Sequence, residues 1–168
     1  MRLLTSRPRL KTMRKRSKYR PKGVRLDPIG YITEGFKPVM EHESFAVDLK
    51  LKNHNALVEL TQGRADKSSI NILISALNIT ESLWRLGFGV EYRQVVDEGI
   101  RALREVGRRG LASGSFVLRS EEMAALTTAM ELHDAQLEVM TIRDMERALA
   151  IVQEEIRNKR CTAIEVKT

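Results

Sequence analysis

Apolar residues recur every three or four positions along most of this chain, which is the spacing of one face of an α-helix. The pattern predicts helices over residues 44–61, 66–86 and 91–109, and a long helical stretch over 120–160. Glycines follow the first three segments, where helices commonly end. Aromatic residues make up only 5% of the chain, which also favours helix packing over a β-sandwich. We therefore expect an all-α protein, a compact bundle of four or five helices.

The segment 66–86 is expected to be the central helix, because apolar residues occupy more than one of its sides. A helix of this kind is usually buried among its neighbours. Asp66 is a favourable N-cap for it, as Ser44 is for the preceding helix. Trp84, near the end of the segment, is interpreted as a core anchor. In the next segment Gly99 lies in the apolar stripe and predicts a close approach to the central helix.

The stretch 120–160 begins at the favourable N-cap Ser120 and contains neither Gly nor Pro. Its two apolar stripes are offset, which either a continuous helix or a break near Thr141 would produce. Thr141 and Asp144 have the spacing of a capping box, so both arrangements stay open. The second stripe has the spacing of a helix–helix seam and is a candidate homodimer surface. It comprises Ile142, Met145, Leu149, Val152 and Ile156.

Residues 1–39 differ from the rest because they contain all four prolines, and proline disfavours helix interiors. This part is predicted to be an arm followed by an extended connector, and residues 40–168 to be the helical bundle domain. Apolar residues between Val24 and Phe36 suggest that the later half of the connector lies on the bundle. Met13 is an alternative start of translation.

The charge of the chain is divided between these two parts. Residues 1–25 contain 11 of the 29 basic residues and no acidic residue. The remainder holds 18 basic and all 22 acidic residues, which is a net charge of −4. An arm of this kind binds phosphate backbones through counterion release, without regard to sequence. The residues predicted to bind nucleic acid are Arg14, Lys15, Arg16, Lys18, Tyr19, Arg20, Lys22 and Arg25.

Two other interpretations of the arm stay open. It can serve an electrostatic contact with the acidic body or with another protein, or it can be a solvated tail without function. The alternative function is a helical module that binds and modulates a host protein through the bundle, with no role in binding nucleic acid. The charge pattern also does not distinguish DNA from RNA. A second basic group, Arg93, Arg101, Arg104, Arg108 and Arg109, lies in the third predicted helix. Favourable interaction of cations with the helix dipole is the preferred explanation for Arg108 and Arg109.

The residues expected of an enzyme or a metal site are not arranged in any familiar pattern. His133 lies beside Asp134, but Met130 stands where the glutamate of a helical Glu-x-x-His metal motif would be. His42 and His54 are isolated in the sequence, and Cys161 has no nearby histidine. There is no phosphate-binding glycine loop. We expect a protein that is not an enzyme, without metal or cofactor, and not inserted in a membrane.

Three short stretches resemble small proteins encoded in phages and prophages of proteobacteria. They are Lys18-Tyr19-Arg20-Pro21-Lys22-Gly23-Val24, Leu51-Lys52-Asn53-His54 and His133-Asp134-Ala135-Gln136-Leu137. The resemblance extends from about Met13 to Arg160. It implies a small accessory protein in a phage context, does not imply an enzyme, and assigns no role to any residue. The lack of an apolar run long enough to span a membrane and of a signal-peptide pattern predicts the cytoplasm of the host bacterium as its location.

Overall fold

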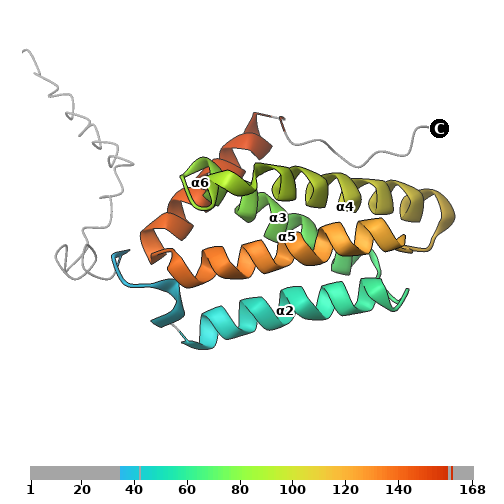
Figure 1. Ribbon diagram of the computed structural model, residues 1–168, viewed down its shortest axis with the longest axis horizontal. Helices are drawn as coiled ribbons and strands as arrows, with labels where there is room; N and C mark the ends of the chain where they lie inside the picture. Colours follow the sequence, from blue (N-terminus) through green and yellow to red (C-terminus); the bar gives the residue numbers. More distant parts are fainter. Residues whose placement is uncertain (1–34, 42, 159, 161–168) are drawn as a thin grey trace, which may run out of the picture.

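The structure is a computed structural model that describes residues 35–41, 43–158 and 160 (Figure 1). Within these residues there are five α-helices and no β-strand, so the predicted all-α bundle is confirmed. The α-helices are α2 (Glu43–Thr61), α3 (Lys67–Arg85), α4 (Arg93–Ser113), α5 (Ser120–Val139) and α6 (Ile142–Arg157). Two short 3-10 helices, η1 (Val39–Glu41) and η2 (Val90–Tyr92), precede α2 and α4.

Helix α3 is the central element, as its apolar sides predict. It packs against each of the other four α-helices. Leu73 and Leu77 on one side of it and Leu83 on another are buried. In Figure 1 it lies behind α4 and α5. Asp66 caps it as expected, because its carboxylate accepts a hydrogen bond of 2.9 Å from the backbone N–H of Ser69. This hydrogen bond lowers the pKa of Asp66.

Helix α4 is longer than predicted. It continues to Ser113 and ends at Gly114, whose φ of 78° is the left-handed conformation common at helix ends. Gly110, predicted to end the helix, is buried inside it. A Cβ atom at Gly110 would lie 2.0 Å from Cδ1 of Phe116, so this glycine makes room for a core aromatic ring.

The close approach predicted at Gly99 occurs, but chiefly with a different helix. A Cβ atom on Gly99 would lie 2.5 Å from Cβ of Ala129 in α5, whereas the nearest α3 atom, Cδ2 of Leu77, would be 3.7 Å away. The main partner of Gly99 is therefore α5, and the prediction that it would be the central helix was wrong. Small residues on both helices bring the α4 and α5 backbones close together.

The stretch 120–160 is two helices, separated at Met140 and Thr141. The capping box forms as its spacing suggests: Oγ1 of Thr141 accepts from the backbone N–H of Asp144, at 3.3 Å. In return, the Asp144 carboxylate accepts from the backbone N–H of Thr141, at 3.1 Å. Met140 and Met145, on either side of the cap, are buried in one apolar cluster. The continuous-helix alternative is excluded.

Two of the predicted N-caps are displaced. Helix α5 has Arg119 as its N-cap, and the carboxylate of Glu122 accepts a 2.9 Å hydrogen bond from the Arg119 backbone N–H. Glu122 thus satisfies the backbone N–H of the N-cap residue, and Ser120, the predicted cap, is the first residue of the helix. Helix α2 begins at Glu43, so Ser44 lies within the helix and not at the position before it.

The end of the connector lies on the bundle at the break between α5 and α6. The backbone N–H of Val39 donates to the carbonyl oxygen of Met140 at 3.1 Å, and that of Ile142 donates to the carbonyl oxygen of Lys37 at 3.0 Å. Val39 is buried in the same cluster as Met140. The expected contact between connector and bundle is therefore confirmed for residues 37–39. Residues of the connector before Gly35 lie outside the described part.

Two aromatic side chains lie under arginines instead of in the core. Trp84 is half-buried, its Nε1 donates to the carbonyl oxygen of Val90 at 3.0 Å, and the Arg93 guanidinium lies 4.4 Å from its ring centroid. Phe36 is 60% exposed, with the guanidinium of Arg143 4.3 Å from its ring. Trp84 therefore stabilises the connection between α3 and α4. The prediction that it anchors the core was wrong.

Candidate functional site

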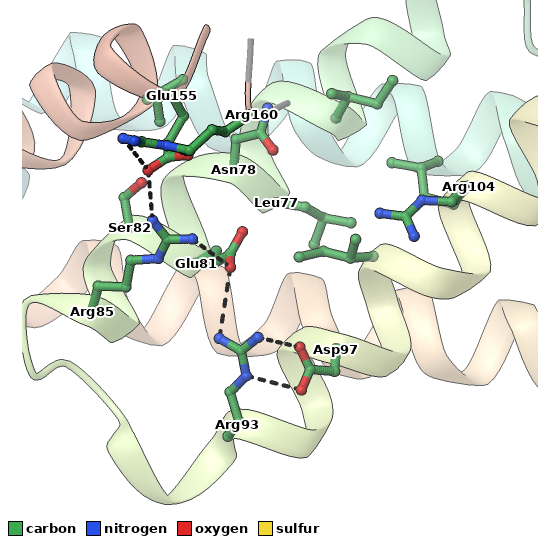
Figure 2. Close-up of a pocket in the computed structure, with 14 residues that line it drawn as sticks. Leu77, Asn78, Glu81, Ser82, Arg85, Arg93, Asp97, Arg104, Glu155 and Arg160 are labelled. Carbon is green, nitrogen blue, oxygen red and sulfur yellow. Dashed lines mark hydrogen bonds and ion pairs between the residues drawn. The ribbon is translucent and has the colours of Figure 1, made fainter. Parts of the chain in front are cut away.

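A cavity of about 340 Å³ lies between α3, α4 and α6 (Figure 2). Helices α4 and α6 both pack on α3, and the cavity occupies the space between them. Its lining combines apolar side chains with four arginines, three carboxylates and the polar residues Asn78 and Ser82. The apolar part consists of Ile74, Leu77, Ile100, Leu103 and Val152.

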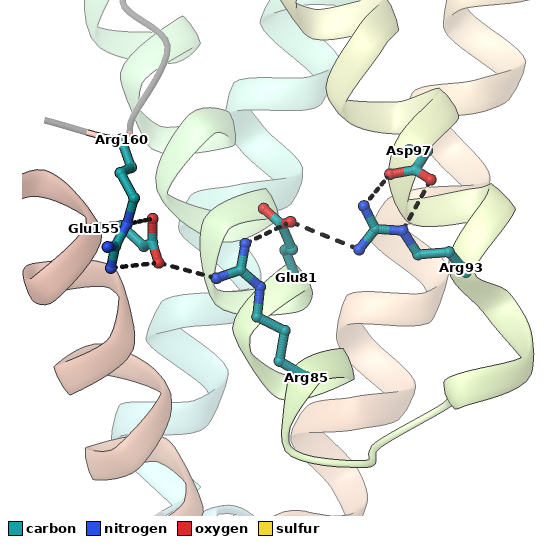
Figure 3. A network of polar contacts seen from close by, with 6 residues as sticks. All are labelled: Glu81, Arg85, Arg93, Asp97, Glu155 and Arg160. Atoms are coloured by element: carbon teal, nitrogen blue, oxygen red, sulfur yellow. Dashed lines mark hydrogen bonds and ion pairs between the residues drawn. The ribbon is translucent and has the colours of Figure 1, made fainter. Parts of the chain in front are cut away.

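Alternating charges line one side of this cavity (Figure 3). Arg93 binds Asp97 one turn ahead of it, with Nε 2.9 Å from Oδ2, and lies 3.6 Å from Glu81. Glu81 also accepts a 3.0 Å hydrogen bond from Arg85, which donates to Glu155 of α6 at 3.1 Å. The ion pairs thereby connect all three helices around the cavity.

The network continues past the end of α6 to Arg160, whose Nε donates to the second oxygen of Glu155 at 2.9 Å. This hydrogen bond is the main reason that the pKa of Glu155 is lowered, and the contact with Arg85 lowers it further. For Arg85, burial disfavours the charge, but its contacts with Glu81 and Glu155 outweigh burial and raise its pKa. These pKa shifts favour the charged forms of Arg85 and Glu155.

One arginine in the lining stands apart from this network. Arg104 is exposed, and it has no hydrogen-bond or ion-pair partner within the described residues. In Figure 2 its guanidinium lies across the cavity from Arg85 and Glu155, with Leu77 between them in this view. All three carboxylates of the lining are already paired, so the positive charge of Arg104 is uncompensated there.

The other arginines of the second basic group are placed differently. Arg101 is exposed and without a partner in the described part, whereas Arg108 pairs with Glu105 at 2.6 Å. Arg109 binds both carboxylate oxygens of Glu122, which raises the pKa of Arg109 and lowers that of Glu122. Because α4 continues to Ser113, Arg108 and Arg109 are not in its last turn, and the helix-dipole interpretation was wrong.

A second polar arrangement lies inside the bundle, around the completely buried His133 of α5. Its Nδ1 is 3.0 Å from Oγ1 of Thr80, and its Nε2 is 3.2 Å from Nδ2 of Asn53. The Thr80 hydroxyl donates to the carbonyl oxygen of Ala76, so it must accept from His133 Nδ1–H. Nε2 then carries no proton and accepts from Asn53. The geometry defines a neutral imidazole.

Burial reinforces this protonation state. It disfavours the charged imidazolium and lowers the pKa of His133 from 6.5 to about 4, although the nearby Asp134 carboxylate opposes the shift. A proton on Nε2 would face the amide N–H of Asn53, which is also a donor. His133 is thus a structural hydrogen-bonding residue at neutral pH, with no opening to substrate.

The stretches 51–54 and 133–137 meet at this point. Helices α2 and α5 contact each other through Asn53 and His133 inside the bundle, and through His54 and Asp134 outside it, where Nε2 and Oδ2 are 2.6 Å apart. Lys50 adds a 2.9 Å ion pair to Glu138. His54 is therefore not isolated in the fold, although it is in the sequence.

The residues predicted to bind nucleic acid lie outside the described part of the chain. This applies to Arg14, Lys15, Arg16, Lys18, Tyr19, Arg20, Lys22 and Arg25. The predicted homodimer stripe is described, and the structure divides it. Met145 is buried, Ile142 and Val152 are partly buried, and Leu149 and Ile156 are 40% and 58% exposed.

The sequence did not single out the cavity. Glu81 with Arg85, and Arg93 with Asp97, are pairs four residues apart on a helix, a recognisable spacing for ion pairs. That signal indicates two local pairs. It contains nothing about the contact from Arg85 to Glu155, which are 70 residues apart.

Comparison of the chain with protein-family models, with curated proteins and with solved structures found no match in any of the three. In the described residues, no three His, Cys, Asp or Glu side chains are grouped so as to hold a metal ion. None of the helices in that part of the chain is long and apolar enough to cross a membrane.

Proposed function

We propose that this protein is a phage-encoded or prophage-encoded accessory protein that contacts nucleic acid without sequence specificity through its basic N-terminal arm. The observation that carries the proposal is the charge division, with 11 basic and no acidic residues in positions 1–25. The phage context comes from the resemblance of the three short stretches.

Ion pairs neutralise several arginines of the bundle, which supports the proposal that the arm is the main source of unpaired positive charge. Arg85, Arg93, Arg109 and Arg160 are each bound to carboxylates, so they contribute little attraction for phosphate. The arm has no acidic residue within it to neutralise its cations. Tyr19, between Lys18 and Arg20, adds an aromatic ring able to stack on an unpaired base.

The arm is tested by measuring binding of the full chain to fluorescent single-stranded and double-stranded DNA and RNA by anisotropy. A variant with Arg14, Lys15, Arg16, Lys18, Arg20 and Lys22 changed to Gln should lose binding at low salt. If all seven cations from Arg14 to Arg25 in the wild-type chain contact phosphate, the logarithm of the association constant for double-stranded DNA falls against the logarithm of salt concentration with a slope of about −6.

A matched control neutralises cations of the bundle instead. Lys52, Arg64, Lys67 and Arg157 are exposed and have no side-chain partner within the described residues. Changing these four to Gln should leave binding nearly unchanged. Equal affinity of the wild-type chain and the arm variant would refute the proposal.

The second candidate is a helical module that binds a host protein and changes its behaviour. It is favoured by an exposed apolar stripe on the outer side of α2, formed by Val47, Leu51 and Val58. Their spacing places all three on one face of the helix. Nuclease-treated host lysate provides the test: a protein retained by the wild-type chain but not by Leu51→Glu/Val58→Glu favours this candidate.

A further inference from the structure

The cavity between α3, α4 and α6 has an apolar part of the kind that holds a hydrocarbon chain. Leu77 is fully buried beneath it, and Ile74, Ile100 and Val152 are partly buried around it. The volume of about 340 Å³ falls within the range of small-molecule sites, which are mostly apolar with a few placed polar groups. The polar groups therefore decide which ligand the cavity suits.

Among the described residues that line the cavity, one guanidinium group has no carboxylate partner. Four guanidinium groups and three carboxylates line it, and each carboxylate binds at least one of Arg85, Arg93 and Arg160. The fourth guanidinium, that of Arg104, binds none of them. A neutral ligand would leave this charge without a partner, and a cationic ligand would be repelled by it. The arrangement is complementary to one negative charge.

The polar residue Asn78 adds hydrogen-bonding capacity to the same lining. It is partly buried on α3, and its side-chain amide has no hydrogen-bond partner among the described residues. An amide N–H group and a guanidinium are both donors, and a carboxylate is an acceptor with two oxygens. Arginine binds carboxylates in a planar, two-point manner, so Arg104 is suited to this head group.

The ion-pair network gives the cavity a fixed wall. Arg85 connects Glu81 of α3 with Glu155 of α6, and Arg93 connects Glu81 with Asp97 of α4. The three helices are thus tied together beside the cavity without any contribution from Arg104. Removing Arg104 should change the charge of the site and leave the wall in place.

We propose that this cavity binds a small amphipathic monoanion, an alkyl carboxylate whose head group contacts Arg104 and whose chain lies on the apolar lining. The site does not depend on the nucleic-acid proposal, because every described lining residue belongs to the bundle or follows α6.

Isothermal titration calorimetry with decanoate tests the site, at concentrations below micelle formation. The full-length wild-type chain should bind it saturably with one site, and Arg104→Met should weaken binding by about tenfold, the effect of losing one hydrogen-bonded charge. Arg101→Met is the matched control, because Arg101 is exposed on the same helix but does not line the cavity. Its affinity for decanoate should equal that of the wild-type chain.

A second variant and a second ligand test the apolar part and the charge separately. Val152→Phe places a larger side chain in the cavity and should weaken decanoate binding while far-UV circular dichroism stays that of a folded helical protein. Decanol, which has the same chain without the charge, should bind at least tenfold more weakly than decanoate. Absence of saturable binding, equal affinity of Arg104→Met, or equal affinity for decanol would each overturn the proposal.

Discussion

His133 forms hydrogen bonds in the core with two buried polar side chains, accepting from Asn53 and donating to Thr80. An unsatisfied buried polar group costs about 1–3 kcal/mol, so the three residues depend on one another. Asn53 also accounts for an odd feature of α2, where the poor helix formers Asn53-His54-Asn55 lie in mid-helix. Cross-helix contacts to α5 compensate for their low propensity.

The lowered pKa of His133 predicts a pH-dependent stability. Between its folded pKa of about 4 and its ordinary value of 6.5, the unfolded chain binds a proton that the folded chain does not. The free energy of unfolding contributed by this residue is therefore fully present above pH 6.5 and falls as the pH is lowered towards 4. From pH 7 to pH 5 the expected loss is roughly 2 kcal/mol.

Urea unfolding of the wild-type chain and of His133→Gln at several pH values measures this effect. The variant should be less stable at pH 7, but its stability should depend less steeply on pH over the same interval. Parallel pH profiles for the two proteins would show that His133 does not titrate as described.

The contacts of single residues could be predicted only where their partners are close in the sequence. The Asp66 cap and the Thr141–Asp144 capping box follow from spacing along the chain, and both form. His133 has partners 80 and 53 residues away, and no local pattern indicates them. The same limit applies to Arg85 and Glu155, and so to the charged wall of the cavity.

At the scale of elements, helix positions followed from apolar periodicity, whereas some helix ends did not. Gly63 and Gly87 do follow helices, with φ of 67° and 103°. Gly110 also follows an apolar stripe in the sequence, but it lies inside α4. Its lack of a side chain leaves room for the ring of Phe116. A glycine needed for packing cannot be told from one needed for a turn without knowing the neighbouring helix.

The α4–α5 contact predicts that substitutions at Gly99 and Ala129 have non-additive effects on stability. Gly99→Ala should destabilise the protein, because a crowded core contact costs about 1–3 kcal/mol and outweighs the gain of about 1 kcal/mol in helix propensity. Ala129→Gly should also destabilise it, by lost propensity. The double variant removes the 2.5 Å clash between the two Cβ positions, so it should be more stable than the sum of the single effects. Thermal unfolding of all four proteins gives the coupling, and additive effects would contradict the contact.

The capping box between α5 and α6 predicts a smaller effect. Thr141→Ala removes the side-chain acceptor for the Asp144 backbone N–H and should lower the free energy of unfolding by about 1 kcal/mol. Thr141→Ser retains the hydroxyl and should lose much less. Guanidinium chloride unfolding distinguishes the two variants, and equal losses would assign the effect to the methyl group instead of the cap.

At the scale of the whole molecule, only part of the predicted homodimer stripe on α6 is available to a second copy of the chain. Helix α3 already covers the side of α6 that includes Met145 and Ala148, which leaves Leu149 and Ile156 available for a second copy. We predict a dimer that Leu149→Glu/Ile156→Glu converts to a monomer without loss of thermal stability. Sedimentation equilibrium measures the mass. A monomeric wild-type chain, or a dimeric variant, would exclude this seam.

The pairing of distant segments has a consequence for the order of events during synthesis. Asn53 and Thr80 leave the ribosome 80 and 53 residues before His133, and residues 37–39 precede their partners at the α5–α6 break by about a hundred. At a synthesis rate of about 5–20 residues per second, several seconds pass between the synthesis of α2 and α3 and that of α5. During that interval the nascent chain exposes the apolar sides of α3. Completion of the core is tied to translation of α5 and α6, and pauses within codons 85–130 should prolong exposure to chaperones.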